Sequence, residues 1–206
     1  MGRISIDLFT TLDGVCQAPG GPEEDTSGWF PFGGWQAPLM DAMVGDSVMA
    51  GIASMDALLL GRRTYDIFAA YWPHHETGPE GAIGSKFAEV PKYVASRSER
   101  DLAWRGSSRV GADLVPEVRA LRERHADVHV IGSVDLVQSL LAEGLFDVLT
   151  LWVYPVVLGQ GKKVFPDGAT PAGLRLLEPA VTGESGAVQL RYGPTGHPPE
   201  TGDMAA

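Results

Sequence analysis

Two segments of this sequence each combine an apolar strand, a glycine and the start of a helix. They are residues 58–64, with the sequence LLLGRRT, and residues 128–134, with the sequence VHVIGSV. A strand that turns at glycine into a helix is the repeating unit of a parallel sheet covered by helices. The chain is therefore expected to fold as an α/β protein, with the two turns at the carboxyl edge of its sheet.

The same two turns predict a binding site. Each places free backbone N–H groups and the positive end of a helix at one point, which suits a phosphate group. Two such points favour a ligand with several phosphates, such as a dinucleotide. Arg62 and Arg63 would add charge-assisted contacts to a further phosphate, which favours NADPH over NADH. Nicotinamide-dependent reduction is the leading interpretation, although each glycine taken alone is equally well explained as a tight turn.

Length and composition fit one soluble domain. The chain has 206 residues, 44% of them hydrophobic and 20% charged, which is enough to bury a full core. A net charge of −10 argues against a nucleic-acid partner or an anionic membrane surface. Cys16 is the single cysteine, which excludes an intramolecular disulfide and a multi-cysteine metal cage. His74 and His75 have no third ligand at a supporting spacing, so no metal site is predicted.

The N-terminal residues predict a location. Residues 1–7 begin a strand at once, without the long apolar region of a secretory signal. No stretch approaches the roughly 18 apolar residues that span a membrane. We therefore expect a cytoplasmic protein with a small-molecule substrate and no membrane partner.

Hydrophobic periodicity predicts the remaining elements. Strands are expected at residues 4–8, 57–60, 93–95, 128–131 and 149–154, and helices at 38–55, 114–125 and 134–143, the last closed by Gly144. Residues 174–177 and 187–192 are expected to form an antiparallel hairpin that turns near residues 183–186. The predicted organisation is one domain over residues 1–193 and a disordered tail over residues 194–206.

A long loop over residues 10–37 separates the first strand from the first helix. Trp29, Phe30, Phe32 and Trp35 crowd its second half. These aromatic side chains either anchor the loop to the core or form a lid or wall for a flat substrate.

Four motifs in this order carry a family resemblance. They are TLDG at residues 11–14, LGRRTY at residues 60–65, the Gly132-Ser133 pair, and a block over residues 144–165. Together they resemble the dihydrofolate reductase-like superfamily. The resemblance is closest to the C-terminal reductase domain of the bifunctional riboflavin-biosynthesis deaminase/reductase, in its stand-alone bacterial form. It implies a three-layer α/β/α fold with a mostly parallel mixed sheet and an antiparallel C-terminal edge.

The resemblance also implies an activity and a set of NADPH-binding residues. Gly61, Arg62, Arg63 and Thr64 would hold the adenosine-side phosphates, and Ser96 and Arg97 would approach the adenine ribose and its 2′-phosphate. Gly132 and Ser133, flanked by Ile131 and Val134, would lie against the pyrophosphate. The implied activity is that of a homodimeric reductase of a pterin- or ribosylaminopyrimidine-like substrate, similar to 5-amino-6-(5-phosphoribosylamino)uracil reductase. A single cysteine cannot build the zinc deaminase site, so the likeness covers the reductase half.

Two carboxylates are candidate catalytic residues. In dihydrofolate reductases a carboxylate on the corresponding helix binds the pterin, and here Asp46 lies nearer the expected offset than Asp41. The alternative is that Asp46 belongs to a solvated helix face, and the loop also lacks the Pro-Trp pair of those enzymes. Asp13 either forms the turn before Gly14 or closes over the nicotinamide or the substrate ribose.

Three other functions remain open beside the reductase. The chain could bind NADPH as a sensor without turnover, could be a dihydrofolate reductase, or could be a dimer whose pocket has decayed. NADPH binding without oxidation would favour the sensor, and loss of NADPH binding would favour the decayed pocket.

Overall fold

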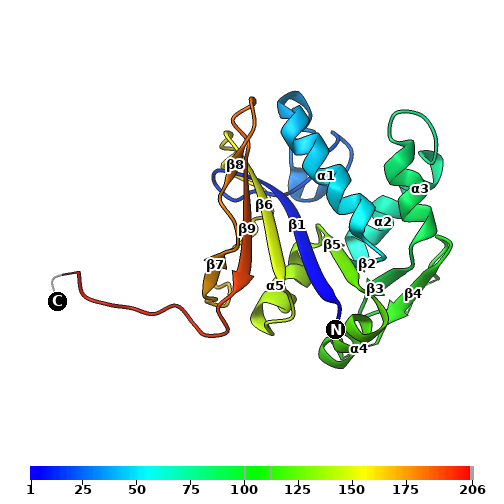
Figure 1. Ribbon diagram of the computed structural model, residues 1–206. Coiled ribbons are helices and arrows are strands. Elements are labelled where there is room, and N and C mark those ends of the chain that lie inside the picture. Colours follow the sequence, from blue (N-terminus) through cyan, green and yellow to red (C-terminus); the bar gives the residue numbers. More distant parts are fainter. Residues whose placement is uncertain (100, 112, 205–206) are drawn as a thin grey trace.

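The computed structural model describes residues 1–99, 101–111 and 113–204 and contains one mixed β-sheet (Figure 1). Its strand order is β4-β3-β2-β5-β1-β6-β9-β7, and β8 pairs with β9. The strands are β1 (Arg3–Thr11), β2 (Ala57–Gly61), β3 (Lys92–Ala95), β4 (Ser107–Val110), β5 (Asp127–Ile131), β6 (Val148–Tyr154), β7 (Leu174–Leu176), β8 (Val181–Thr182) and β9 (Val188–Pro194). The six strands from β4 to β6 run parallel, whereas β9 is antiparallel to β6, β7 and β8.

Helices cover both faces of this sheet. They are α1 (Ala42–Ser54), α2 (Arg62–Tyr71), α3 (Gly81–Glu89), α4 (Leu114–Arg124) and α5 (Val134–Ala142). Residues of α1, α2 and α3 share one buried cluster with Leu58 and Leu60, whereas those of α4 and α5 share another with Ile4 and Ile6. The three-layer fold with a mostly parallel mixed sheet and an antiparallel C-terminal edge is confirmed.

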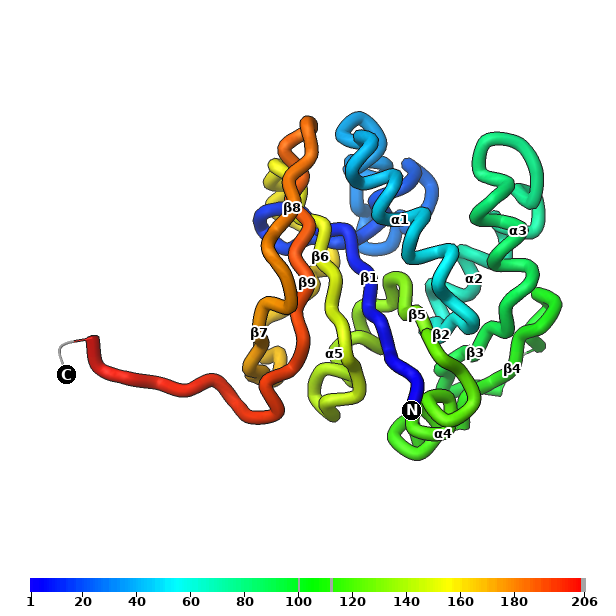
Figure 2. Tube along the Cα trace, in the orientation of Figure 1, coloured from blue at the N-terminus to red at the C-terminus, as the bar shows by residue number. Residues whose placement is uncertain are grey.

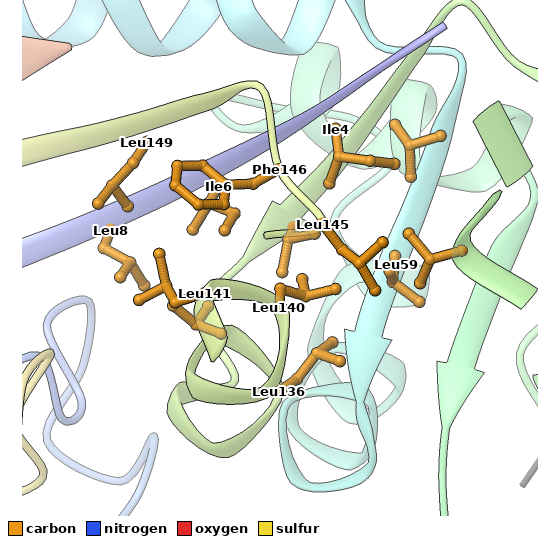
Figure 3. Packing of buried hydrophobic residues seen from close by; sticks show 14 of the residues in the cluster. Ile4, Ile6, Leu8, Leu59, Leu136, Leu140, Leu141, Leu145, Phe146 and Leu149 are labelled. Atoms are coloured by element: carbon orange, nitrogen blue, oxygen red, sulfur yellow. The ribbon is translucent and has the colours of Figure 1, made fainter. Parts of the chain in front are cut away.

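The larger core cluster follows from the alternation of side chains along β1. Ile4, Ile6 and Leu8 are 0 to 2% exposed and pack against α5 through Leu136 and Leu140 (Figure 3). The residues between them therefore point to the opposite face of the sheet, toward α1. That opposite face carries the polar residues that matter below.

The start of the first helix differs from the prediction. It begins at Ala42 rather than at Pro38, because the Asp41 carboxylate accepts a hydrogen bond from the Val44 N–H and so caps the helix. Pro38 lies instead in a 3-10 turn over Ala37–Leu39. Within the helix, residues 42–54 show the predicted helical spacing.

Other differences concern short elements. The turn at residues 183–186 joins β8 to β9, so the predicted strand at residues 174–177 pairs with β9 farther along, at Tyr192 to Pro194. Neither α3 nor β4 was predicted. In α3, Gly84 is needed because a Cβ there would lie 2.1 Å from the His75 carbonyl oxygen. Glycine has a low helix propensity, so the sequence of this segment does not indicate a helix.

The C-terminal segment leaves the body of the molecule after β9 (Figure 2). Residues 195–204 contain no helix or strand, and residues 205 and 206 of the predicted tail lie outside the described residues. Disorder of this tail stays a prediction. Within the described ranges, no helix is long and apolar enough to cross a membrane.

Candidate functional site

The two glycine turns meet at the carboxyl edge of the sheet. Strands β2 and β5 are neighbours, yet α2 leaves toward one face of the sheet and α5 toward the other. Such a point is where open α/β sheets hold ligands. The Gly61 N–H donates a hydrogen bond of 2.7 Å to the Ser133 hydroxyl, so the starts of both helices are fixed side by side.

Backbone conformation explains why this place needs glycine. A Cβ at Gly61 would lie 2.8 Å from the Ser133 Cβ, closer than real Cβ atoms approach one another. Gly132 has a φ of +68°, in the left-handed region, and a Cβ there would lie 3.6 Å from Thr64 Cγ2. We call Gly61, Thr64, Gly132 and Ser133 the glycine junction, since the structure brings these four predicted residues together.

The two predicted arginines diverge from the junction. Arg62 Nε donates 3.0 Å hydrogen bonds to Asp66, and its guanidinium lies 5.9 Å from the centre of the Tyr65 ring. Its Nη1 is buried and has no hydrogen-bond partner in the described part of the chain. A buried guanidinium nitrogen without an acceptor is costly.

Arg63 faces a different space. It lines an open depression of about 460 Å³ together with Gln17, Lys162 and the loop around Phe30. The depression therefore lies between the start of α2 and two loops. Lys162 forms an ion pair with Asp25, so Arg63 is the cationic side chain of this lining that remains to attract an anionic group of a ligand.

The other predicted cofactor residues occupy the same edge. Ser96 and Arg97 follow β3, the neighbour of β2, and Arg97 is exposed, whereas the Ser96 hydroxyl donates to the Ser98 carbonyl. Ile131 ends β5 and Val134 begins α5, and both are half-buried beside the junction. The structure brings these residues to one edge without testing whether they bind a cofactor.

The aromatic loop divides between the two predicted roles. Phe30 and Trp35 are 7% and 9% exposed and anchor the loop in a cluster with Trp152 and Tyr154. Trp29 is 95% exposed and lines a second depression beside Phe30. Anchoring accounts for the buried pair, whereas Trp29 is free to contact a ligand.

Asp13 ties two loops together. Its carboxylate accepts hydrogen bonds from the Thr11 hydroxyl (2.6 Å) and from the N–H groups of Leu158 (3.2 Å) and Gly159 (2.8 Å). These hydrogen bonds lower the pKa of Asp13. With both oxygens engaged, Asp13 holds the turn after β1 against residues 158–159, which favours the turn interpretation.

Asp46 lies on the exposed face of α1. The next residue, Ser47, points to the sheet and accepts a hydrogen bond from Gln189 of β9. Asp46 itself has no hydrogen bond or ion pair with any described residue. Its exposure agrees with the solvated-face alternative.

A charged cluster that sequence analysis missed lies beneath α1. His129 of β5 is 5% exposed, and its Nδ1 lies 2.6 Å from Asp7 Oδ2 of β1. Its Nε2 lies 3.3 Å from Asp127 Oδ2, at ion-pair distance but without hydrogen-bond geometry. Asp127 also accepts hydrogen bonds from Arg3, from Ser5 and from Ser54 of α1. We call Arg3, Asp7, Asp127 and His129 the buried charge network.

Electrostatics keep the imidazole of this network charged. Burial lowers the pKa of His129, but the close carboxylate of Asp127 and the hydrogen bond and charge of Asp7 outweigh it and raise the pKa to about 9. Burial raises the pKa of Asp127, yet His129 and Arg3 hold it well below its usual range. One signal was present in the sequence: His129 lies inside the apolar strand predicted over residues 128–131, where a polar residue needs a partner.

Comparisons with known proteins agree with this geometry. A family model described as the RibD C-terminal domain matches residues 3–186. The chain belongs to the RibD C-terminal domain family. The predicted family resemblance is thereby confirmed. A Bacillus subtilis relative, the uncharacterized protein YyaP, is 28% identical over 192 residues, which cover 92% of this chain and 94% of that protein.

Solved structures with low sequence identity share the fold. A Shewanella sp. PV-4 protein with a provisional riboflavin-biosynthesis assignment has a TM-score of 0.67, with 17% identity over 94% of this chain and 99% of that one. A Thermotoga maritima diaminohydroxyphosphoribosylaminopyrimidine deaminase/5-amino-6-(5-phosphoribosylamino)uracil reductase gives 0.60, with 16% identity over 94% and 56%. Enterococcus faecalis dihydrofolate reductase, complexed with NADP(H), gives 0.55, with 16% identity over 94% and 97%.

Proposed function

We propose that this protein is an NADPH-dependent reductase that delivers hydride to a pterin- or ribosylaminopyrimidine-like substrate. The observation that carries the proposal is the glycine junction, where Gly61 and Ser133 join the starts of α2 and α5 beside a buried, unpartnered Arg62 nitrogen. Backbone N–H groups at two helix starts and a free guanidinium nitrogen fit the pyrophosphate and the 2′-phosphate of one NADPH molecule.

Each part of the site would have a separate task. Bound NADPH supplies the hydride, and the chain holds and orients it. The N–H groups around Gly132 and Thr64 would bind the pyrophosphate, while Arg62 and the exposed Arg97 would bind the 2′-phosphate. Arg63 would screen the charge of the phosphates from the side of the depression.

The comparisons support this proposal. Proteins with the same fold include a 5-amino-6-(5-phosphoribosylamino)uracil reductase and a dihydrofolate reductase complexed with NADP(H). Their identity to this chain is 16%, so the substrate rests on the family and on the chemistry of the site.

Cofactor titration tests the proposal. Quenching of tryptophan fluorescence is expected to give a Kd for NADPH at least about tenfold below that for NADH, because each hydrogen bond to a charged phosphate contributes about 1.5–3 kcal/mol. Equal affinity would contradict the assignment of the arginines. NADPH binding without oxidation across pterins and ribosylaminopyrimidines would favour the sensor.

We also propose that the protein acts as a homodimer. The edge strands expose apolar side chains, among them Leu176 at 48% and Val181 at 43%. A second copy of the chain would remove this apolar surface from water. Light scattering at micromolar concentration is expected to give twice the mass of the 21.9 kDa chain, and a monomer mass would contradict this proposal.

A further inference from the structure

Ser133 occupies the N-cap position of α5 but does not cap that helix. Its backbone is left-handed, with a φ of +61° and a ψ of +66°, whereas N-cap residues usually adopt extended backbone. Its hydroxyl makes no hydrogen bond to the first turn of α5 and accepts instead the N–H of Gly61, 2.7 Å away at the start of α2. By contrast, the N-cap residues Asp41 and Asp113 accept hydrogen bonds from the first turns of α1 and α4. Ser133 therefore joins two helices instead of capping its own.

The left-handed backbone of Ser133 is strained. In this region the Cβ of an L-residue crowds the backbone, a cost that glycine does not have. The preceding Gly132, with a φ of +68°, turns without that cost, and a glycine at position 133 would do the same. What glycine lacks is the hydroxyl that accepts the Gly61 N–H. Because strained residues cluster at functional sites, this hydrogen bond is the feature of Ser133 that calls for a functional explanation.

The hydrogen bond joins the ends of two strands beyond the point where their ladder stops. Strands β2 and β5 pair at residues 57–58 and 128–129, and their described ladder extends no farther toward the carboxyl edge. Helices α2 and α5 leave on opposite faces of the sheet and belong to different core clusters. Gly61 admits the hydroxyl, because a Cβ there would lie 2.9 Å from Ser133 Oγ. The Ser133 hydroxyl is therefore the contact that sets the distance between the two helix starts.

Both helix starts keep N–H groups that can bind an anion. The first N–H groups of an α-helix have no acceptor inside the helix, and no side chain caps those of α2 or α5. Each start therefore suits one phosphate group. Two starts at a fixed distance suit an anion with two linked phosphate groups better than a single phosphate.

We propose that Ser133 is a positioning residue, which aligns the starts of α2 and α5 and thereby selects a pyrophosphate group over a single phosphate. This role deepens the proposed reductase function and rests on it, since NADPH contains a pyrophosphate. Loss of the hydroxyl would release the two starts from each other without closing either of them. Each start would still bind one phosphate, but the pair would no longer bind both groups of one ligand.

Calorimetric titration with inorganic pyrophosphate and inorganic phosphate, at one ionic strength, tests this role. The wild-type chain is expected to bind pyrophosphate at least about tenfold more tightly than phosphate, because the second group adds charged hydrogen bonds at the other helix start. Ser133→Ala should reduce this ratio to less than about threefold and change the affinity for phosphate less than about twofold. Ser139→Ala removes a hydroxyl from an exposed position of the same helix and is the matched control, which should keep the wild-type ratio.

A second variant separates positioning from a role in stability. Ser133→Gly also lacks the hydroxyl but relieves the left-handed strain, so its melting temperature should exceed that of Ser133→Ala. Positioning predicts the same loss of pyrophosphate preference in both variants. The proposal is overturned by an unchanged ratio, by a loss that follows the melting temperature, or by a phosphate affinity that falls as much as the pyrophosphate affinity. If Ser133→Ala does not fold, the ratio measured for Ser133→Gly decides.

NADPH is titrated separately, so that this inference and the proposed function can fail independently. Ser133→Ala is expected to lower the affinity for NADPH at least about tenfold. An affinity for NADPH that Ser133→Ala leaves unchanged would overturn the role of Ser133 and leave the reductase standing. A pyrophosphate preference that depends on Ser133, in a protein that does not bind NADPH, would overturn the reductase and leave the role of Ser133 standing.

Discussion

The glycine junction and the buried charge network share strand β5 but are built in opposite ways. The junction uses backbone groups and one hydroxyl, at turns where a side chain would collide or strain the chain. The network uses charged side chains from β1 and β5, brought together by the register that sets Ser5 opposite His129. Changes at the junction should therefore affect ligand binding, whereas changes in the network should affect the stability of the fold.

The largest expected effect is on the network. His129→Leu removes the cation between Asp7 and Asp127. Arg3 still pairs with Asp127, but the Asp7 carboxylate loses its ion-pair partner. Loss of one partner of a buried ion pair typically costs about 3–5 kcal/mol, so the free energy of unfolding should fall by about that amount in urea denaturation. His74→Leu, at an exposed position, is the control and should change it by less than about 0.5 kcal/mol. A small loss for His129→Leu would mean that its imidazole is neutral in the folded chain.

The matching change at the junction is Gly132→Val. A β-branched residue resists the positive φ of this position and would alter the path of the N–H groups, so NADPH affinity should fall at least about 100-fold. Gly144→Val, at the other end of α5, imposes a similar φ strain at +62° far from the junction. It should cost stability but preserve NADPH affinity. Equal NADPH binding by both variants would show that the phosphates bind elsewhere.

The pH dependence of stability tests the charge of His129 in the buried charge network. The pKa of His129 is raised to about 9 in the folded chain, so its charged form stabilises the fold fully below pH 6.5 and loses this contribution as pH rises through 9. The difference in unfolding free energy between wild type and His129→Leu should therefore shrink by about 2–3 kcal/mol between pH 7 and pH 10.

Comparing the wild type with His129→Leu also removes a contribution of Lys92 that has the opposite pH dependence. Burial lowers the pKa of Lys92 to about 8, so Lys92 makes the fold more stable as pH rises. Both proteins contain Lys92, and its contribution drops out. A difference that stays constant up to pH 10 would contradict the charged state of His129.

The contrast between the regions also explains what the sequence could predict. Gly61, Thr64, Gly132 and Ser133 were identifiable because each turn has a local signal, a glycine between an apolar run and a helical pattern. The partnership of Asp7 with His129 depends on the register of two strands that lie more than 120 residues apart. No local pattern encodes that register. For the same reason the sequence predicted the parallel sheet but missed α3, whose glycines serve tertiary contacts.

Arg62 offers a smaller effect that sharpens the comparison. Arg62→Gln removes the unpartnered guanidinium nitrogen. It should lower the affinity for NADPH about tenfold and change the affinity for NADH less than about twofold. The same substitution at Arg97 should lower the affinity for NADPH less, because Arg97 is exposed and solvent ions screen its charge. Titration of both cofactors against both variants measures this. Equal losses of affinity for NADPH and NADH would indicate that Arg62 binds the pyrophosphate rather than the 2′-phosphate.

The smallest effect is expected for Asp46→Asn. Asp46 is exposed on α1 and has no hydrogen bond or ion pair with a described residue, so its loss should change the unfolding free energy by less than about 0.5 kcal/mol. If Asp46 belongs to a solvated helix face, Asp46→Asn should also leave the rate of NADPH oxidation within about twofold of the wild-type rate. A fall in turnover with unchanged NADPH affinity would instead assign Asp46 to substrate binding or proton relay.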